Sequence, residues 1–200
     1  MARVGTSDGQ ADQVGIQNII NSGWGWNGWV YLDPCTNTTG CPSPAEHVQR
    51  VNYSLNLAQP QELNKTNYGM FPNAFFINIQ GQWSSNRMVN QQILTEYVQA
   101  AAATFEGTSF ITDYTTWSTN FGPYWTVPAS AGDASGVPFI WWRKYDGRTD
   151  TNGFSPFGNF TMVLLKQYAQ NVNNRAVSHF IHWTLHPPET VHQQRTLHPP

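Results

Sequence analysis

The segment AFFINIQG, residues 74–81, gives the clearest strand signal in the chain. It is apolar, is bounded by Pro72 and Gly81, and is too short for a helix. The clearest helix follows at residues 86–105, where one face carries apolar side chains every four residues, at Val89, Ile93, Tyr97, Ala101 and Phe105. A buried strand followed by an amphipathic helix is the basic unit of a parallel α/β sheet.

The same alternation extends to both sides of this unit. Further short strands are predicted at residues 4–6, 29–32, 109–112, 137–142 and 162–168, and a helix at residues 10–21. A second helix is predicted up to residue 57, because Ser43 can cap it, Pro44 suits its first position and Glu46 can complete a capping box. After residue 105 the helical signal weakens. The sequence therefore predicts an α/β sheet, open or closed into a barrel, with mostly loop connections in its second half.

The composition excludes several classes of partner. The 200 residues suit one domain, only 11% of them are charged, and the net charge of -2 comes without a basic stripe, so nucleic acid is not expected. No run approaches 18 apolar residues, so no membrane span is expected, and the first residues do not read as a signal peptide. Nine Trp and 14% aromatic residues suit sugar contact, although most Trp in proteins are core residues.

Two cysteines and four sequons are typical of a secreted protein. Cys35 and Cys41 lie in a Pro-Cys-x5-Cys-Pro loop, which predicts a short disulfide, whereas two thiols alone make a poor metal site. Acceptor motifs for N-linked glycans occur at Asn37, Asn52, Asn64 and Asn159. A chain this rich in Asn and Thr carries sequons by chance, so they permit glycosylation without establishing it.

The end of the chain differs in pattern from the rest. The pentapeptide TLHPP at residues 184–188 recurs at residues 196–200. We therefore expect a domain over residues 1–174 and an extended tail over residues 175–200. The tail is rich in His, but its prolines argue against a regular helix and no diagnostic ligand spacing is present, so neither a metal nor another cofactor is expected.

Several segments are collinear with a known family: residues 31–35 (YLDPC), 41–45 (CPSPA), 74–81, 83–85 (WSS), 90–92 (NQQ), 111–117 (ITDYTTW), 141–146, 154–158 (FSPFG) and 166–168. They resemble the eukaryotic, amoeba- and nematode-type lysozymes of glycoside hydrolase family 25. The resemblance covers about residues 3 to 170. It implies a modified (β/α), TIM-like barrel with fewer helices in its second half, and a glycan as partner.

The chain departs from the family at its catalytic strand. Where the family carries Asp-x-Glu, this chain has Asn78 and Gln80. Residues two apart on a strand point the same way, roughly 6 to 7 Å apart, which suits a pair of groups flanking a glycosidic bond. Amides keep the shape and hydrogen bonding but cannot ionise, and loss of general acid catalysis alone costs about 10²- to 10⁴-fold.

The resemblance also fails at both ends. The family begins with a strand, bearing another active-site Asp, and a helix that precede the point matching Arg3, and it ends in a strand that residues 177–183 do not match. A barrel without its first strand has two open edges. We therefore expect homo-oligomer formation through these edges or the tail; the alternative is that the sequence is incomplete.

Other residues are candidates for chemistry or glycan contact. Asp33, Asp113 and Asp146 follow predicted strands, so they could line the mouth of a barrel and replace the lost acids, or simply cap turns. Trp83 and Trp142 are the first candidates for stacking on sugars because they lie beside predicted strand ends. Tyr114 and Tyr145 are the next candidates.

These features predict a secreted lysozyme-like pseudoenzyme that binds glycan or builds an extracellular assembly, of which a filament is one form. One alternative is an active muramidase that cleaves β-1,4 links in peptidoglycan with other carboxylates. Another is a purely structural subunit without glycan affinity.

Overall fold

A computed structural model describes residues 1–21, 29–36, 39–58, 74–105, 107–129, 131 and 138–169. Its strands are β1 (Ala2–Gly5), β2 (Trp29–Leu32), β3 (Ala74–Asn78), β4 (Thr108–Thr112), β5 (Ile140–Arg143) and β6 (Val163–Gln167). Its helices are α1 (Gln13–Asn21), α2 (Pro44–Ala58), α3 (Arg87–Ala102) and α4 (Tyr114–Asn120). The predicted tail, Asn37 and Asn64 lie outside the described residues.

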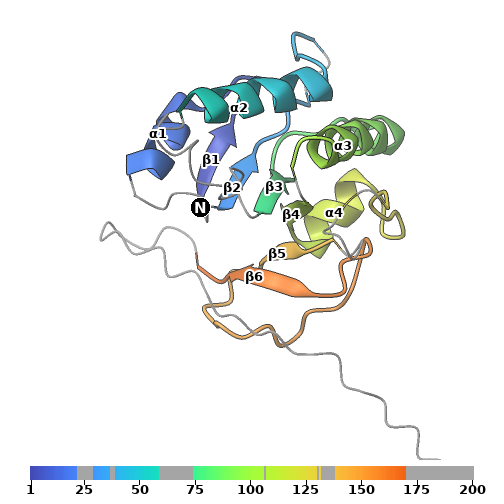
Figure 1. Ribbon diagram of the computed structural model, residues 1–200. Helices are drawn as coiled ribbons and strands as arrows, with labels where there is room; N and C mark the ends of the chain where they lie inside the picture. Colours follow the sequence, from blue (N-terminus) through green and yellow to red (C-terminus); the bar gives the residue numbers. More distant parts are fainter. Residues whose placement is uncertain are drawn as a thin grey trace, which may run out of the picture.

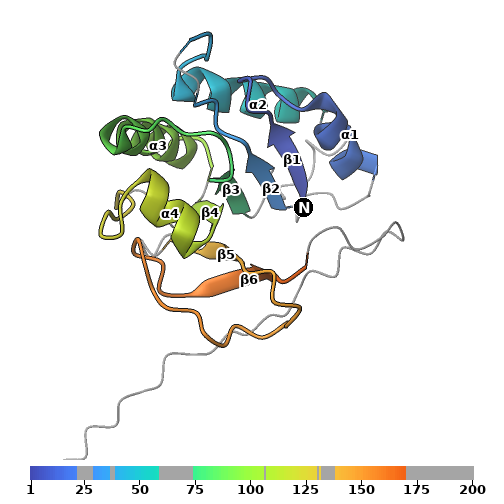
Figure 2. The ribbon, with the colours of Figure 1, turned by 180° about the vertical axis from the view of Figure 1, so that it is seen from behind.

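The strands form one parallel sheet in the order β1-β2-β3-β4-β5-β6. A sequential parallel order carries every crossover along the same face, as in the wall of a (β/α) barrel. Figures 1 and 2 show the strands as an arc with the four helices along its outer side. Beside β5 and β6 this outer side carries the connection of residues 144–162 in place of a long helix.

The predicted α/β class is confirmed, but a closed barrel is not. Within the described residues, β1 and β6 are the edges of the sheet and do not pair with each other. In the described part of the chain the structure shows an open, six-stranded parallel sheet instead of a barrel. Its strands follow one another in sequence order, as they do in a (β/α) barrel.

Local sequence signals explain how the helices begin. The predicted capping box of α2 forms: the backbone N of Glu46 donates to Ser43 Oγ (3.2 Å), and the backbone N of Ser43 donates to Glu46 Oε2 (2.9 Å). Asn86 caps α3 by accepting from the backbone N of Met88. The predicted disulfide between Cys35 and Cys41 is also present, with 5.7 Å between the Cα atoms.

Alternation along the strands divides the core into two clusters. Phe75 and Ile77 of β3 belong to the larger cluster between the sheet and the helices. Phe76 belongs to a smaller cluster on the inner, concave face, with Ile111 and Trp141. Because side chains alternate with period two, the next inward position on β3 after Phe76 is Asn78. No helix in the described part of the chain is long and apolar enough to cross a membrane.

Candidate functional site

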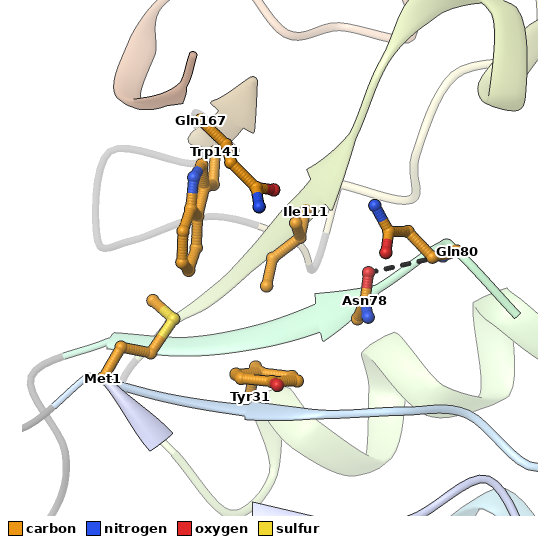
Figure 3. Close-up of a pocket in the computed structure, with 7 residues that line it drawn as sticks. All are labelled: Met1, Tyr31, Asn78, Gln80, Ile111, Trp141 and Gln167. Carbon is orange, nitrogen blue, oxygen red and sulfur yellow. Dashed lines mark hydrogen bonds between the residues drawn. The ribbon is translucent and has the colours of Figure 1, made fainter. Parts of the chain in front are cut away.

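A pocket of about 280 Å³ lies on the concave face of the sheet (Figure 3). The residues that line it are Met1, Tyr31, Asn78, Gln80, Ile111, Trp141 and Gln167. They include side chains from strands β2 to β6, or from the turn after β3. None of these lining residues is acidic.

Strand register accounts for this gathering. Asn78 pairs with Ile111 of β4, and Ile111 pairs with Trp141 of β5. Residues in register on neighbouring parallel strands present their side chains to the same face at the same height. An amide, an aliphatic group and an indole therefore form a continuous row across three strands.

The Asn78 carboxamide is held in one orientation by a carboxylate. Its Nδ2 donates to Asp33 Oδ1 over 2.7 Å, and its Oδ1 accepts from the backbone N of Gln80 over 3.3 Å. Turning the amide over would place its oxygen against the carboxylate, so the chemistry fixes which atom points where. Asp33 Oδ2 is in turn 3.4 Å from Nη1 of Arg3, whose Nε bonds Asp12 over 2.8 Å.

Gln80 lies in the turn that follows β3, and its side chain is exposed. Figure 3 shows its carboxamide beside Asn78 at the rim of the pocket, on the side of β3 that faces Ile111. Asn78 and Gln80 thus line one pocket, both as neutral amides that can donate and accept hydrogen bonds. That they occupy the positions of the family's catalytic acids stays a prediction.

The three acids proposed as substitutes do not line this pocket. Asp33 is engaged by Asn78 and Arg3. Asp113 caps α4 by accepting from the backbone N of Thr116 (2.8 Å), and it pairs with Arg143 at 2.8 Å. This arrangement matches the turn-capping alternative for Asp113.

Asp146 is also bound to a cation. Lys166 Nζ donates to its two carboxylate oxygens over 2.9 and 3.0 Å, and the same ammonium reaches the backbone oxygen of Asp150 over 2.8 Å. The hydrogen bond from Lys166 holds the pKa of the Asp146 carboxyl below its usual value. A carboxyl held ionised in this way is poorly suited to act as a general acid.

The structure corrects the choice of Trp142 as a stacking residue. Trp142 is 6% exposed, belongs to the core cluster on the helix side of the sheet, and has the ammonium groups of Lys144 and Lys166 5.0 and 5.1 Å from its ring centroid. Trp141, the preceding residue, points to the concave face and lines the pocket. Trp141 is also a stacking candidate on sequence, ranked behind Trp142, and the two residues differ by one position of the strand alternation.

Trp83 is likewise engaged inside the fold. It is half-buried, its Nε1 donates to the backbone oxygen of Ile79 (3.2 Å), and its ring meets Phe121 edge-on at 4.9 Å. It packs against the cluster on the helix side and does not line the pocket. Trp83 therefore contributes to the core beneath the turn that carries Gln80.

The two tyrosine candidates are exposed, and one of them contacts a pocket residue. Tyr114 is 53% exposed and meets Phe157 edge-on, away from the pocket residues. Tyr145 is 48% exposed, and its hydroxyl donates to Gln167 Oε1 over 3.4 Å. Three further lining residues, Tyr31, Ile111 and Gln167, carry no signal in the sequence that marks them as site residues. They come from three different strands, and the register of the sheet brings them to the same pocket.

Tyr31 closes one side of the pocket. It is half-buried, and burial, together with the nearby Asp33 charge, raises the pKa of its hydroxyl. The phenol therefore stays protonated and can donate a hydrogen bond. Within the described residues, no group of three or more His, Cys, Asp or Glu side chains could hold a metal ion.

Comparison with known proteins agrees with the motif resemblance. The chain is 24% identical over 170 residues to lysozyme-like protein 5 of Caenorhabditis elegans, which covers 84% of this chain and 71% of that protein. It is 26% identical over 148 residues to the probable GH family 25 lysozyme 5 of Dictyostelium discoideum, which covers 72% of this chain and 59% of the relative. No protein-family model and no solved structure matches. The predicted resemblance is confirmed: over most of its length the chain is similar to lysozyme-like proteins of glycoside hydrolase family 25.

Proposed function

We propose that this chain is a lysozyme-like protein that binds glycan in the concave pocket without hydrolysing it efficiently. The observation that carries the proposal is the pairing of Asn78 with Gln80 in a pocket that has no acidic lining residue. Hydrolysis of a glycosidic bond by the usual route requires two carboxyl groups on either side of that bond. Neutral amides can hold a sugar but cannot exchange a proton with it.

The pocket chemistry suits an uncharged saccharide. Asn78, Gln80 and Gln167 supply amide donors and acceptors, and the Tyr31 hydroxyl adds another donor. Trp141 supplies aromatic surface of the kind that packs against the apolar face of a sugar ring. A small set of polar groups around an apolar wall is the usual composition of a ligand site.

The active-muramidase alternative is less well supported by the geometry. Of the three candidate acids, Asp33 contacts a lining residue, through its 2.7 Å hydrogen bond with Asn78. Its two oxygens are engaged by Asn78 and Arg3, and Asp33 does not itself line the pocket. Asp113 and Asp146 are held by Arg143 and Lys166.

Secretion and assembly complete the proposal. The Cys35–Cys41 disulfide supports an oxidising, extracellular location. In the described part of the chain β1 and β6 are the edge strands of the sheet. Ala11 and Asp12 already meet the outer side of β1 at Gly5 and Val4, so β6 offers the more open strand surface through which copies could associate. Size-exclusion chromatography that finds only compact monomers would exclude this assembly.

Two assays on the unaltered protein test the proposal. In a turbidity assay on bacterial cell walls we expect no clearing, and in a sedimentation assay we expect binding to insoluble peptidoglycan. Gln80→Ala and Trp141→Ala should weaken the binding, whereas Gln99→Ala, on the exposed face of α3, should leave it unchanged. Clearing at a normal lysozyme rate would establish the muramidase alternative, and absence of binding would favour a purely structural subunit.

The reverse experiment restores the acids. Asn78→Asp with Gln80→Glu introduces the family pair, but the new carboxylate at position 78 would meet Asp33. Adding Asp33→Asn removes that conflict, so any gain in lytic activity should be larger in the triple variant than in the double variant. If neither variant clears cell walls, the pocket lacks more than the two acids.

A further inference from the structure

The sequon at Asn159 lies in a tight turn between β5 and β6. The backbone N of Phe160 donates to the backbone oxygen of Phe157 over 2.7 Å, and these two residues form an antiparallel bridge. Gly158 has a φ of 57° and Asn159 a φ of 72°. Positive φ at both central residues defines a type I′ turn, and Asn is one of the few residues other than Gly that adopt such a conformation readily.

Burial alternates sharply through this turn. Phe157 and Phe160 are 7% and 0% exposed and pack in the core cluster on the helix side. Asn159 and Thr161, the two residues that define the sequon, are both exposed. The turn is thus anchored by its phenylalanines, while its acceptor amide and the hydroxyl two residues later face solvent.

The other described sequon has the opposite environment. Asn52 lies within α2 and is only partly exposed, and its Oδ1 accepts a hydrogen bond from Asn56 over 3.3 Å. The sequon hydroxyl of Ser54 accepts from Gln13 Nε2 of α1 over 3.1 Å. A sugar on Asn52 would have to fit against packed helices, whereas N-linked glycans occupy surface loops.

We infer that Asn159 is an acceptor site for an N-linked oligosaccharide and that Asn52 is not. In the modification, Asn159 Nδ2 bonds to the anomeric carbon of an oligosaccharide carried on a lipid pyrophosphate. The bond from that carbon to the pyrophosphate oxygen breaks, the lipid pyrophosphate leaves, and Nδ2 gives up one proton. The turn packs through Gly158 against Trp117 on the helix side of the sheet, so the glycan leaves the concave pocket open.

The test uses the full chain directed into the secretory pathway of a eukaryotic host by a foreign signal sequence. Enzymatic release of N-glycans in ¹⁸O water converts each occupied Asn into labelled Asp, which peptide mass spectrometry locates. We expect label at position 159 and none at position 52. An unlabelled position 159 or a labelled position 52 would overturn the inference.

Matched variants separate loss of the sequon from loss of the fold. Thr161→Ala removes the sequon at an exposed position and should abolish one glycan step in gel mobility, whereas Thr161→Ser should keep it. Asn159→Gly also removes the acceptor and tolerates the φ of 72°. Ser54→Ala should change nothing. Because glycans are added before export, both retained and secreted chains are analysed. If Thr161→Ala carries the same number of mobility steps as the unaltered chain in both, the assignment is refuted.

Discussion

Asn78→Asp is predicted to convert a stabilising hydrogen bond into a repulsive pair of carboxylates. The Asn78 amide donates to Asp33 over 2.7 Å, and the substitution replaces this donor with a second acceptor. Loss of a hydrogen bond to a charged partner costs about 1.5–3 kcal/mol. Two unit charges at that distance repel by about 6 kcal/mol at an effective dielectric constant of about 20, before side chains relax.

The pair will therefore hold one proton at pH values where an isolated carboxyl has lost it. Because two carboxylates this close repel each other, we expect the upper pKa of the variant pair to rise. In this pH range the folded variant holds a proton that the unfolded chain, with carboxyl pKa values of about 4, has released. The variant therefore becomes less stable relative to the unaltered protein as the pH rises from about 4 through the raised pKa.

Urea unfolding of Asn78→Asp between pH 4 and 8 measures this effect. The destabilisation relative to the unaltered protein should reach about 3 kcal/mol at neutral pH and shrink toward pH 4. The control is Asp33→Asn with Asn78→Asp, which restores one donor and one acceptor in reversed order and should remove the added pH dependence. A destabilisation independent of pH, or as large in the control, would refute the reasoning.

Two further predictions concern the scaffold. Burial lowers the pKa of His47 from 6.5 to about 4, so His47 stays neutral in the fold, and stability should fall by about 3 kcal/mol as the pH drops from 6.5 to 4. His47→Gln should flatten this dependence in urea titrations, and an unchanged slope would contradict it. Gly158→Ala should lower the free energy of unfolding by about 1–3 kcal/mol, because its Cβ would lie 2.7 Å from the Trp117 ring and its φ is 57°. Thermal denaturation measures the loss of stability. Gly147→Ala is the control for the backbone cost alone, because Gly147 has a φ of 70° and nothing within 4 Å of an added Cβ. The difference between the two variants gives the cost of the clash with Trp117, and equal losses would contradict it.

The sequence predicted the strands well because each is a short apolar run between turn residues. The run at residues 74–81 became β3, and the alternation within it fixed Asn78 on the concave face. In β5 the sequence makes both Trp141 and Trp142 candidates, and proximity to a strand end favours Trp142, whereas alternation places Trp141 on the pocket face. Register between distant strands is a tertiary property, and it alone brings Tyr31 and Gln167 to the same site.

The three longer helices were predicted, but the buried surface of α3 was predicted only in part. Leu94 and Val98 of α3 are fully buried although they lie outside the predicted apolar face, because α3 packs against both α2 and β4 and so buries more than one stripe. Helix α4 was missed, since its seven residues are too few for a periodic signal. The cap of α4 was visible as Asp113, which sequence reasoning considered mainly as an acid.

The amide at position 78 and the acid at position 33 are best understood as one unit. Near neutral pH a carboxylate at position 78 would be incompatible with an ionised Asp33 at the 2.7 Å separation, whereas an amide turns the same contact into a charge-assisted hydrogen bond. Arg3 contacts the second oxygen of Asp33 and is also paired with Asp12, so one guanidinium is shared by two acidic side chains that do not line the pocket. On the proposed function, the amide at position 78 therefore does more than lack a proton to donate. It fits a hydrogen-bond network that keeps carboxylates off the pocket lining, and a variant designed to hydrolyse glycan would have to replace this network.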